Sequence, residues 1–202
     1  MKTIFLIDDQ VAVRRALGEM LQVFGFSVEL YDSAQSFLNE FHPTKGGCIV
    51  SDVRMDGIDG IQLLQELRRR KITLPVVLIS GHADVPMAVA GIKAGAEDLV
   101  EKPIDDRQLV AAINRAMARF FDQQVAKESM RSLEEAFSRL TARQVEIFDM
   151  AGSGMTSQAI ASKLGISVRT VESARAQIMG KMGAENATIL VRQAIRLGRI
   201  AP

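Results

Sequence analysis

The chain has 202 residues, of which 48% are hydrophobic and 24% charged, so it is long enough for one large or two small domains with buried cores. Its apolar runs span only a handful of residues, which excludes a transmembrane helix of about 20 residues. Two carboxylates follow the short apolar run at the N-terminus, so we expect no secretory signal and a cytoplasmic protein without a membrane partner. A single cysteine, Cys48, excludes an internal disulfide and a thiolate zinc site.

The net charge of +1 is unevenly distributed along the chain. Residues 139–202 contain nine lysines and arginines against four acidic residues, a net charge of +5, so the preceding 138 residues carry −4. An acidic first part joined to a basic last part indicates two domains with different partners. Nucleic acid is the candidate partner of the second domain.

Short apolar strands and helical patterns alternate over the first 120 residues. Near-continuous apolar strands separated by helices predict a parallel sheet covered on both faces, and five such units are too few for an eight-fold barrel. We therefore predict a doubly wound α/β domain over residues 1–120. The predicted strands are Thr3–Ile7, Ser27–Leu30, Cys48–Ser51, Val76–Ser80 and Asp98–Val100, and the predicted helices are Val11–Phe24, Ser33–Phe41, Ile58–Arg70, Asp84–Ala94 and one beginning at Asp105.

The fifth helix has no evident end in the sequence. Between Asp105 and Arg139 there is neither proline nor glycine, and apolar residues recur at helical spacing. This pattern favours one long helix that continues out of the first domain as a linker over residues 121–138. Two helices broken near Asp122 and Gln123 are the alternative.

Residues 139–202 show helical patterns only, which predicts a small all-α domain. The short connection around Gly165 is typical of a helix-turn-helix, whose core we expect to be closed by Ile160, Leu164, Ile166 and Val171. The predicted helices are Thr141–Ala151, Thr156–Leu164, Ser167–Met182 and Thr188–Leu197, and their first residues are the predicted N-caps.

Polar side chains follow the predicted strands at the points where the strands end. In a doubly wound sheet, ligands bind at the carboxyl ends of the strands. This rule brings together Asp8 and Asp9 after the first strand, Asp52 at the end of the third, Ser80 at the end of the fourth and Lys102 after the fifth. Converging carboxylates repel one another unless a divalent cation neutralises them, and hard oxygen ligands favour Mg²⁺. For Asp8 or Asp9 alone, helix capping is the alternative interpretation.

These residues carry a resemblance to a known family. The pattern is similar to the receiver domain of two-component response regulators, in which a sensor histidine kinase phosphorylates the central aspartate. The resemblance implies a flavodoxin-like, five-stranded sheet in the order 2-1-3-4-5. The residues of the pattern are Asp8, Asp9, Asp52, Ser80, Lys102 and Pro103.

Carried onto this chain, the resemblance implies a role for each of these side chains. Asp52 is the expected phosphoacceptor, and Ser80 and Lys102 are expected to bind the phosphoryl oxygens. Phosphoryl transfer depends mainly on charge neutralisation and positioning, which suits this set of residues. The expected Mg²⁺ ligands are Asp8, Asp9, Asp52 and the backbone carbonyl of Arg54.

Two positions depart from the family pattern. The family usually has an aromatic residue three positions before the active-site lysine, where this chain has Leu99, so no aromatic ring is there to rotate as the loop closes. Asp56 stands where the family commonly has a proline, and it adds a carboxylate near the site. We therefore expect the loop after Ser80 to transmit the switch. Its segment 80–89 is similar to the FixJ subgroup, and we expect His82 within it to be a loop residue.

The C-terminal part carries a second resemblance. The runs 140–148 (LTARQVEIF) and 164–172 (LGISVRTVE) resemble the LuxR/FixJ-type DNA-binding domain, which implies that residues 139–202 form such a domain. Gln144 occupies a position that is often glutamate in this family, and Ala174 one that is often histidine. Neither change removes an apolar core position, so we expect altered contacts within an unaltered fold.

The resemblance implies that helix 167–182 lies in the major groove of double-stranded DNA. Glu172 is then expected to accept from a cytosine amino group, and Arg175 or Gln177 to donate to purines. Arg169, Thr170 and Lys181 are expected to contact phosphates, which position the helix without specifying sequence. The candidate DNA-binding residues are Ser167, Arg169, Thr170, Glu172, Ser173, Arg175, Ala176, Gln177 and Lys181.

The sequence thus predicts a two-component response regulator that controls transcription and is not an enzyme. We expect phosphorylation to change the surface of residues 84–100 and to promote a homodimer, which would bind two half-sites about 10 base pairs apart or a multiple of that spacing. Constitutive dimerisation through the long helix is an alternative. So is a regulator whose receiver binds partners without phosphorylation. A phosphatase of the haloacid-dehalogenase type is disfavoured, because its two aspartates stand two residues apart whereas Asp8 and Asp9 are adjacent.

Overall fold

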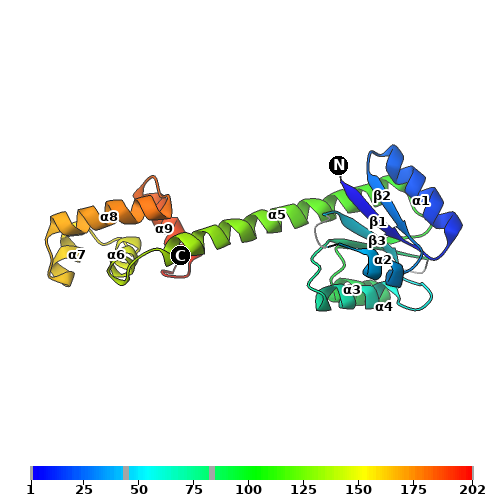
Figure 1. Ribbon diagram of the computed structural model, residues 1–202, viewed down its shortest axis with the longest axis horizontal. Helices are drawn as coiled ribbons and strands as arrows, with labels where there is room; N and C mark the ends of the chain where they lie inside the picture. The colour runs from blue at the N-terminus through cyan, green and yellow to red at the C-terminus, as the bar shows by residue number, and fades with distance from the viewer. Residues whose placement is uncertain (1, 43–45, 82–84, 202) are drawn as a thin grey trace. The chain divides into compact units, whose positions relative to one another are not determined.

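The chain folds into two compact units, residues 1–123 and residues 124–202 (Figure 1). The structure is a computed structural model that describes residues 2–42, 46–81 and 85–201. Over those ranges, every helix is too short or too polar to span a bilayer.

A parallel five-stranded sheet forms the centre of the first unit, as predicted. Its order is β2-β1-β3-β4-β5, and all four neighbouring pairs are parallel. The register pairs Ile7 with Ser51 and Ser80 with Glu101, so the carboxyl ends of four strands reach one edge of the sheet. The strands are β1 Thr3–Ile7, β2 Ser27–Tyr31, β3 Cys48–Asp52, β4 Val76–Ser80 and β5 Asp98–Glu101.

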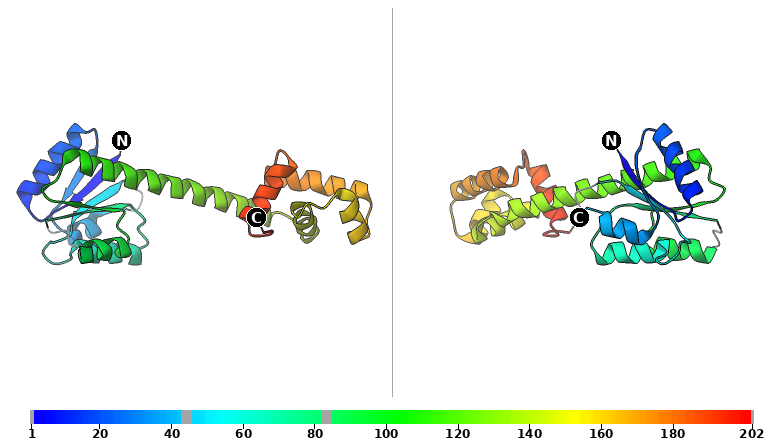
Figure 2. Two further views of the ribbon diagram at one scale, coloured as in Figure 1. Left: turned by 180° about the vertical axis from the view of Figure 1, so that it is seen from behind. Right: turned by 45° about the vertical axis from the view of Figure 1, so that its right-hand side comes forward.

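Helices cover both faces of this sheet, and each face has its own apolar core. One core joins the sheet to α1 and the first turns of α5, with Leu21 and Ile113 fully buried. The other joins the sheet to α2, α3 and α4, with Phe37 and Leu63 fully buried. The view from behind shows these two layers of helices on either side of the strands (Figure 2). The helices are α1 Val11–Val23, α2 Ala34–Glu40, α3 Gly60–Arg69, α4 Val85–Ala94 and α5 Asp106–Ser138.

Helix α5 is continuous over 33 residues, so the single long helix is confirmed and the alternative break near Asp122 is wrong. The Asp105 side chain accepts a hydrogen bond from the backbone N–H of Gln108 and caps the first turn. Residues 109–117 contribute five buried side chains to the core of the first unit, and Leu133 and Phe137 pack in the core of the second. Residues 118–132 are all described, and none of them is buried.

The second unit consists of the end of α5 and four shorter helices. Phe148, Ile160, Val171 and Ile178 form the centre of its core. Leu164 and Ile166 pack against this core at the tight turn between α7 and α8, where Gly165 adopts a left-handed conformation with φ of 64°. The helices are α6 Ala142–Gly152, α7 Ser157–Leu164, α8 Val168–Met182 and α9 Ala187–Arg196.

Three of the four predicted N-caps of this unit are confirmed. The side chains of Thr141, Thr156 and Ser167 each accept a hydrogen bond from a backbone amide in the first turn. The fourth prediction is wrong, because Asn186 rather than Thr188 caps α9, through a bond from the N–H of Ile189. In the first unit, His82 and the predicted start of the fourth helix at Asp84 lie outside the described residues.

Gly60 allows helix α3 to begin directly beneath the end of β3. A Cβ atom at this position would lie 2.5 Å from the carbonyl oxygen of Asp52 and 3.0 Å from the Cα of Val53. Both neighbours are backbone atoms of the strand end, so they cannot move aside without displacing the Asp52 loop. The absence of a side chain at Gly60 therefore sets how closely α3 approaches the candidate site.

We predict that Gly60→Ala lowers the free energy of unfolding by about 1–3 kcal/mol, because the added methyl group forces backbone atoms apart. Urea unfolding of the full chain measures this change. Gly18→Ala is the matched control, since its Cβ would meet only the side chain of Leu30, which is 47% exposed and can move. Equal effects of the two substitutions would contradict the prediction.

Candidate functional site

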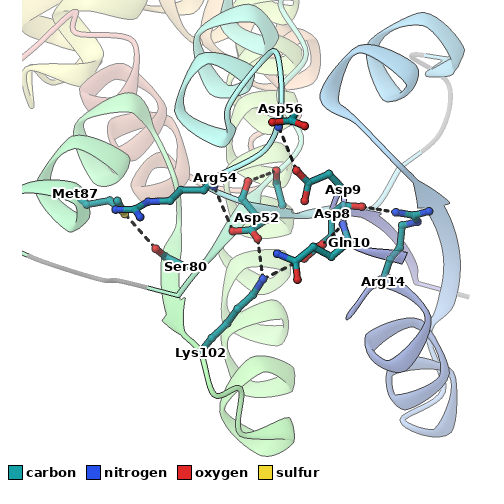
Figure 3. A network of polar contacts seen from close by, with 11 residues as sticks. Asp8, Asp9, Gln10, Arg14, Asp52, Arg54, Asp56, Ser80, Met87 and Lys102 are labelled. Carbon is teal, nitrogen blue, oxygen red and sulfur yellow. Dashed lines mark hydrogen bonds and ion pairs between the residues drawn. The ribbon is translucent and has the colours of Figure 1, made fainter. Parts of the chain in front are cut away.

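Four polar side chains meet at the carboxyl edge of the sheet. Asp8 follows β1, Asp52 ends β3 and Lys102 follows β5, and parallel pairing of these strands brings the three positions together. Figure 3 shows the Lys102 side chain reaching Asp52 and Asp8, with Asp9 beside them. The predicted convergence of these residues is therefore present in the fold.

Lys102 forms the central ion pair of this cluster. Its Nζ lies 2.7 Å from Oδ2 of Asp52 and 3.2 Å from Oδ2 of Asp8. Asp8 is fully buried and Asp52 is 4% exposed, so the ammonium group is in contact with two carboxylates that are shielded from water. The chain itself thus supplies part of the positive charge that the converging carboxylates require.

The protonation equilibria of Asp8 and Lys102 reflect this burial. Burial raises the pKa of Asp8, although the N–H of Gln10 and the Lys102 ammonium both favour the charged carboxylate. Burial also opposes the charge on Lys102, but its bond to Asp52 and the charges of Asp52 and Asp8 outweigh that effect, so the pKa of Lys102 is raised. The ammonium group therefore keeps its proton throughout the neutral range.

The loop after β3 folds over Asp52 and meets the loop after β1. The carboxylate of Asp52 accepts a hydrogen bond from the N–H of Arg54 at 3.3 Å, and that of Asp9 accepts one from the N–H of Asp56 at 3.2 Å. An open cleft of about 460 Å³ adjoins these residues. Its lining includes Asp9, Arg54, Met55, Asp56 and Met87. The Asp9 carboxylate and the backbone that follows Asp52 therefore adjoin open space at this edge of the sheet.

The oxygen donors at this edge suit a small divalent cation. Across residues 2–42, 46–81 and 85–201, no three histidine, cysteine or acidic side chains are grouped closely enough to ligate a metal by themselves. Mg²⁺ does not require such a cage, because it keeps several water ligands and binds through one or two carboxylates. The carboxylates of Asp9 and Asp52 and the carbonyl of Arg54 provide that kind of donor set.

Ser80 and Leu99 contact residues on the α4 side of the sheet. The Ser80 hydroxyl is buried and lies 3.2 Å from the sulfur of Met87 on α4. Leu99 is half-buried and packs in the core between the sheet and α4. Both side chains connect the sheet to α4.

Sequence reasoning missed two residues at this edge. Arg14, in the first turn of α1, donates to the backbone carbonyl of Asp8 at 2.5 Å and fixes the end of β1. Met87 contacts Ser80, as described above. The position of Arg14 one turn after Gln10, at the start of a helix that follows two aspartates, was the available signal.

Most of the predicted DNA-binding residues lie on one exposed surface of the second unit. The predicted DNA-binding residues that are exposed on α8 and its N-cap are Ser167, Arg169, Thr170, Glu172, Ser173, Ala176 and Gln177. A shallow hollow on this surface is lined by Ser167, Arg169, Thr170, Ser173, Ala174 and Gln177.

Arg175 and Lys181 differ from the sequence-based prediction. Arg175, a candidate donor to purines, is half-buried, and its guanidinium donates to the backbone carbonyl of Met155 at 3.4 Å. Lys181 is also half-buried and donates to the backbone carbonyl of Arg139 at 2.9 Å and to the side chain of Gln144 at 2.7 Å. The hydrogen bonds that both side chains make therefore stabilise the second unit itself.

Comparisons with known proteins agree with this geometry. The family described as "Response regulator receiver domain" matches residues 4–114, and the family described as "Bacterial regulatory proteins, luxR family" matches residues 138–194. The chain belongs to the family of FixJ-like response regulators. This response regulator is 39% identical to the transcriptional regulatory protein FixJ of Azorhizobium caulinodans, over 98% of this chain and 94% of that protein.

Solved structures give the same result for the whole response regulator. Full-length FixJ from B. japonicum is 37% identical, with a TM-score of 0.63 over 98% of both chains. The response regulator StyR is 35% identical, with a TM-score of 0.83 over 96% of this chain and 98% of that one. The receiver fold followed by a helix-turn-helix domain is thus confirmed.

We predict that Asp8→Asn changes the pH dependence of stability. Because burial raises the pKa of Asp8 in the folded protein, its contribution to the free energy of unfolding falls as the pH rises from the ordinary value of an aspartate through the raised value. The variant lacks this loss, so its stability relative to the wild type should increase from acidic to neutral pH. Urea unfolding at a series of pH values, without divalent cations, measures the difference, and a difference that does not vary with pH would contradict it.

Proposed function

We propose that this response regulator is phosphorylated on Asp52 by a sensor histidine kinase and thereby controls its binding to promoter DNA. The observation that carries the proposal is the shielded Asp52 carboxylate, whose Oδ2 lies 2.7 Å from the ammonium of Lys102, next to a cleft that Asp9, Val53 and Arg54 help to line. Receiver domains as a family imply a histidine kinase, and LuxR-type domains imply DNA.

Each residue of the cluster has a separate role in phosphoryl transfer. A carboxylate oxygen of Asp52 forms the new bond to phosphorus as the bond between phosphorus and the kinase histidine breaks. Lys102 then pairs with a phosphoryl oxygen and offsets the arriving charge. Asp8 keeps Lys102 beside the reacting carboxylate through its 3.2 Å contact. Asp9, Asp52 and the carbonyl of Arg54 would hold Mg²⁺, which supplies further positive charge for the phosphoryl oxygens.

The bond between Ser80 and Met87 supports a route from the site to the surface. We propose that the Ser80 hydroxyl exchanges the sulfur of Met87 for a phosphoryl oxygen, which is the stronger acceptor. This exchange releases a contact between β4 and α4. The outer face of α4 carries Val85, Val89 and Ile92, which are 77%, 45% and 53% exposed. A change at this apolar face is suited to promoting a homodimer.

The proposed division of labour follows the domains. Residues 1–120 act as the receiver, residues 121–138 as a helical linker and residues 139–202 as the DNA-binding domain, with α8 in the major groove. The basic charge of the last part and the exposed Arg169, Thr170 and Glu172 support this role. We propose a cytoplasmic location, where a regulator meets both kinase and chromosome.

We predict that Asp52→Asn abolishes labelling by a small phosphodonor such as acetyl phosphate in the presence of Mg²⁺, because the amide lacks the nucleophilic carboxylate. Intact-mass analysis of the full chain measures the label. Asp56→Asn is the matched control: it removes a carboxylate from the same loop, where only the backbone N–H of Asp56 bonds to Asp9, and it should keep the label.

Light scattering on the same samples tests the dimer, which should form in the labelled wild type and not in Asp52→Asn. Labelling of Asp52→Asn at the wild-type level would overturn the assignment of the phosphoacceptor. Labelling without any change in molecular mass would overturn phosphorylation-driven dimerisation.

Arg169→Ala should weaken DNA binding to all sequences alike and reduce the slope of log affinity against log salt by about one, because one phosphate contact is lost. Binding to duplex DNA at several salt concentrations measures this slope. Arg192→Ala removes the same charge from an exposed position on α9 and should leave the slope closer to that of the wild type. An unchanged slope for Arg169→Ala would argue against a phosphate contact.

The second candidate function is regulation without phosphorylation, in which the receiver is a module for dimerisation or partner binding. It is favoured by Leu99, which packs in the core beneath α4 at the position where the family usually has an aromatic ring. Wild-type protein that binds DNA as a dimer and takes up no label from the phosphodonor would support this candidate over the first.

A further inference from the structure

Gln144 links the start of α6 to the recognition helix α8 through a buried hydrogen-bond network. It is 7% exposed and occupies the third helical position of α6. Its Oε1 accepts from the backbone N–H of Thr141 at 3.1 Å and from Nζ of Lys181 at 2.7 Å. Its Nε2 lies 3.0 Å from Oε1 of Gln177.

This network fixes the orientation of two amides. The groups at the Oε1 end of Gln144 are a backbone N–H and an ammonium, which only donate, so that end must be the oxygen. The other end is then the NH₂ group, which only donates. The atom of Gln177 that faces it must therefore be the carbonyl oxygen of Gln177.

The NH₂ group of Gln177 is available to donate to another partner. Gln177 is exposed, and in the described part of the chain its side chain makes no second hydrogen bond. It lies in the same hollow as Arg169, Thr170 and Ser173, on the surface of α8 that we propose meets DNA. Gln177 thus presents a donor to that surface, while its acceptor is occupied inside the unit.

We propose that Gln144 is a positioning residue for DNA recognition, which sets Gln177 to donate to an acceptor on DNA. The inference rests on the proposed function of the second domain. Acceptors of this kind are guanine N7 and O6, thymine O4 and the phosphate oxygens. The two-bond contact of a glutamine with adenine is disfavoured, because it uses the carbonyl oxygen of Gln177, which faces Gln144.

Gln144→Glu isolates this role from folding. A glutamate oxygen still accepts from Thr141 and Lys181, and glutamate suits the same capping position, so the urea midpoint should stay at or above the wild-type value. Glutamate cannot donate, however, so Gln177 must turn its NH₂ inward and expose its carbonyl oxygen. The substitution therefore inverts the hydrogen-bonding polarity of Gln177 without changing residue 177.

The experiment is a selection from a randomised duplex library with full-length protein, in the presence of the phosphodonor and Mg²⁺. If Gln177 contacts a base, Gln144→Glu should replace guanine or thymine by adenine or cytosine at one position of each half-site. If it contacts a phosphate, the selected sequence should persist and the affinity should fall about two- to tenfold for all sequences, the loss of one hydrogen bond.

The control is the same substitution in a Gln177→Ala background. The negative charge that Gln144→Glu adds acts in both backgrounds, whereas the positioning effect requires Gln177. In the Gln177→Ala background, Gln144→Glu should therefore leave the base preference unchanged and change the affinity only by the effect of its charge. Equal effects in both backgrounds, or a Gln177→Ala variant that binds like the wild type, would overturn the inference while the proposed function stands. A wild type that binds no DNA would overturn both.

Discussion

The contact of one ammonium group with two buried carboxylates organises the receiver half of this protein. Lys102 is placed by β5, Asp52 by β3 and Asp8 by β1, so the ion pairs form only when three strands are aligned in parallel. A buried charge destabilises the folded protein unless it is paired with an opposite charge. Here Lys102 pairs with Asp52, 50 positions earlier in the chain, and with Asp8, 94 positions earlier. The site is therefore a product of the whole sheet rather than of any local motif.

The neighbours of the cluster explain how a local charge can act at a distance. Ser80 lies at the end of β4, next to the central strand β3, and is bonded to Met87 on α4, and Leu99 packs beneath the same helix. The hydrogen bond from Ser80 to the thioether sulfur is weaker than one to a carbonyl or a carboxylate, because sulfur is a weak acceptor. Position 99 is leucine rather than an aromatic residue, and the contact of Ser80 with Met87 directly links the end of β4 to α4.

The sequence was sufficient for features that depend on periodicity and strand ends. The strands, the long helix and the meeting of Asp8, Asp52 and Lys102 follow from alternating apolar runs and from the rule that ligands gather at carboxyl ends. The directions of individual side chains could not be predicted from the sequence. Arg175 and Lys181 have the spacing of surface residues, but carbonyl groups 20 and 42 residues away turn them inward. Asn186 and Thr188 are both good caps, and only the path of the chain after α8 decides between them.

Helix α5 has a further consequence for the integrity of the chain. Its two ends are anchored in separate apolar cores, while the side chains of residues 118–132 gain nothing from burial. Helical backbone without tertiary packing is marginally stable in water and opens locally at little cost. A protease would therefore find accessible bonds in this stretch, and a cut there would separate the receiver from the helix-turn-helix domain while leaving each half with its own core.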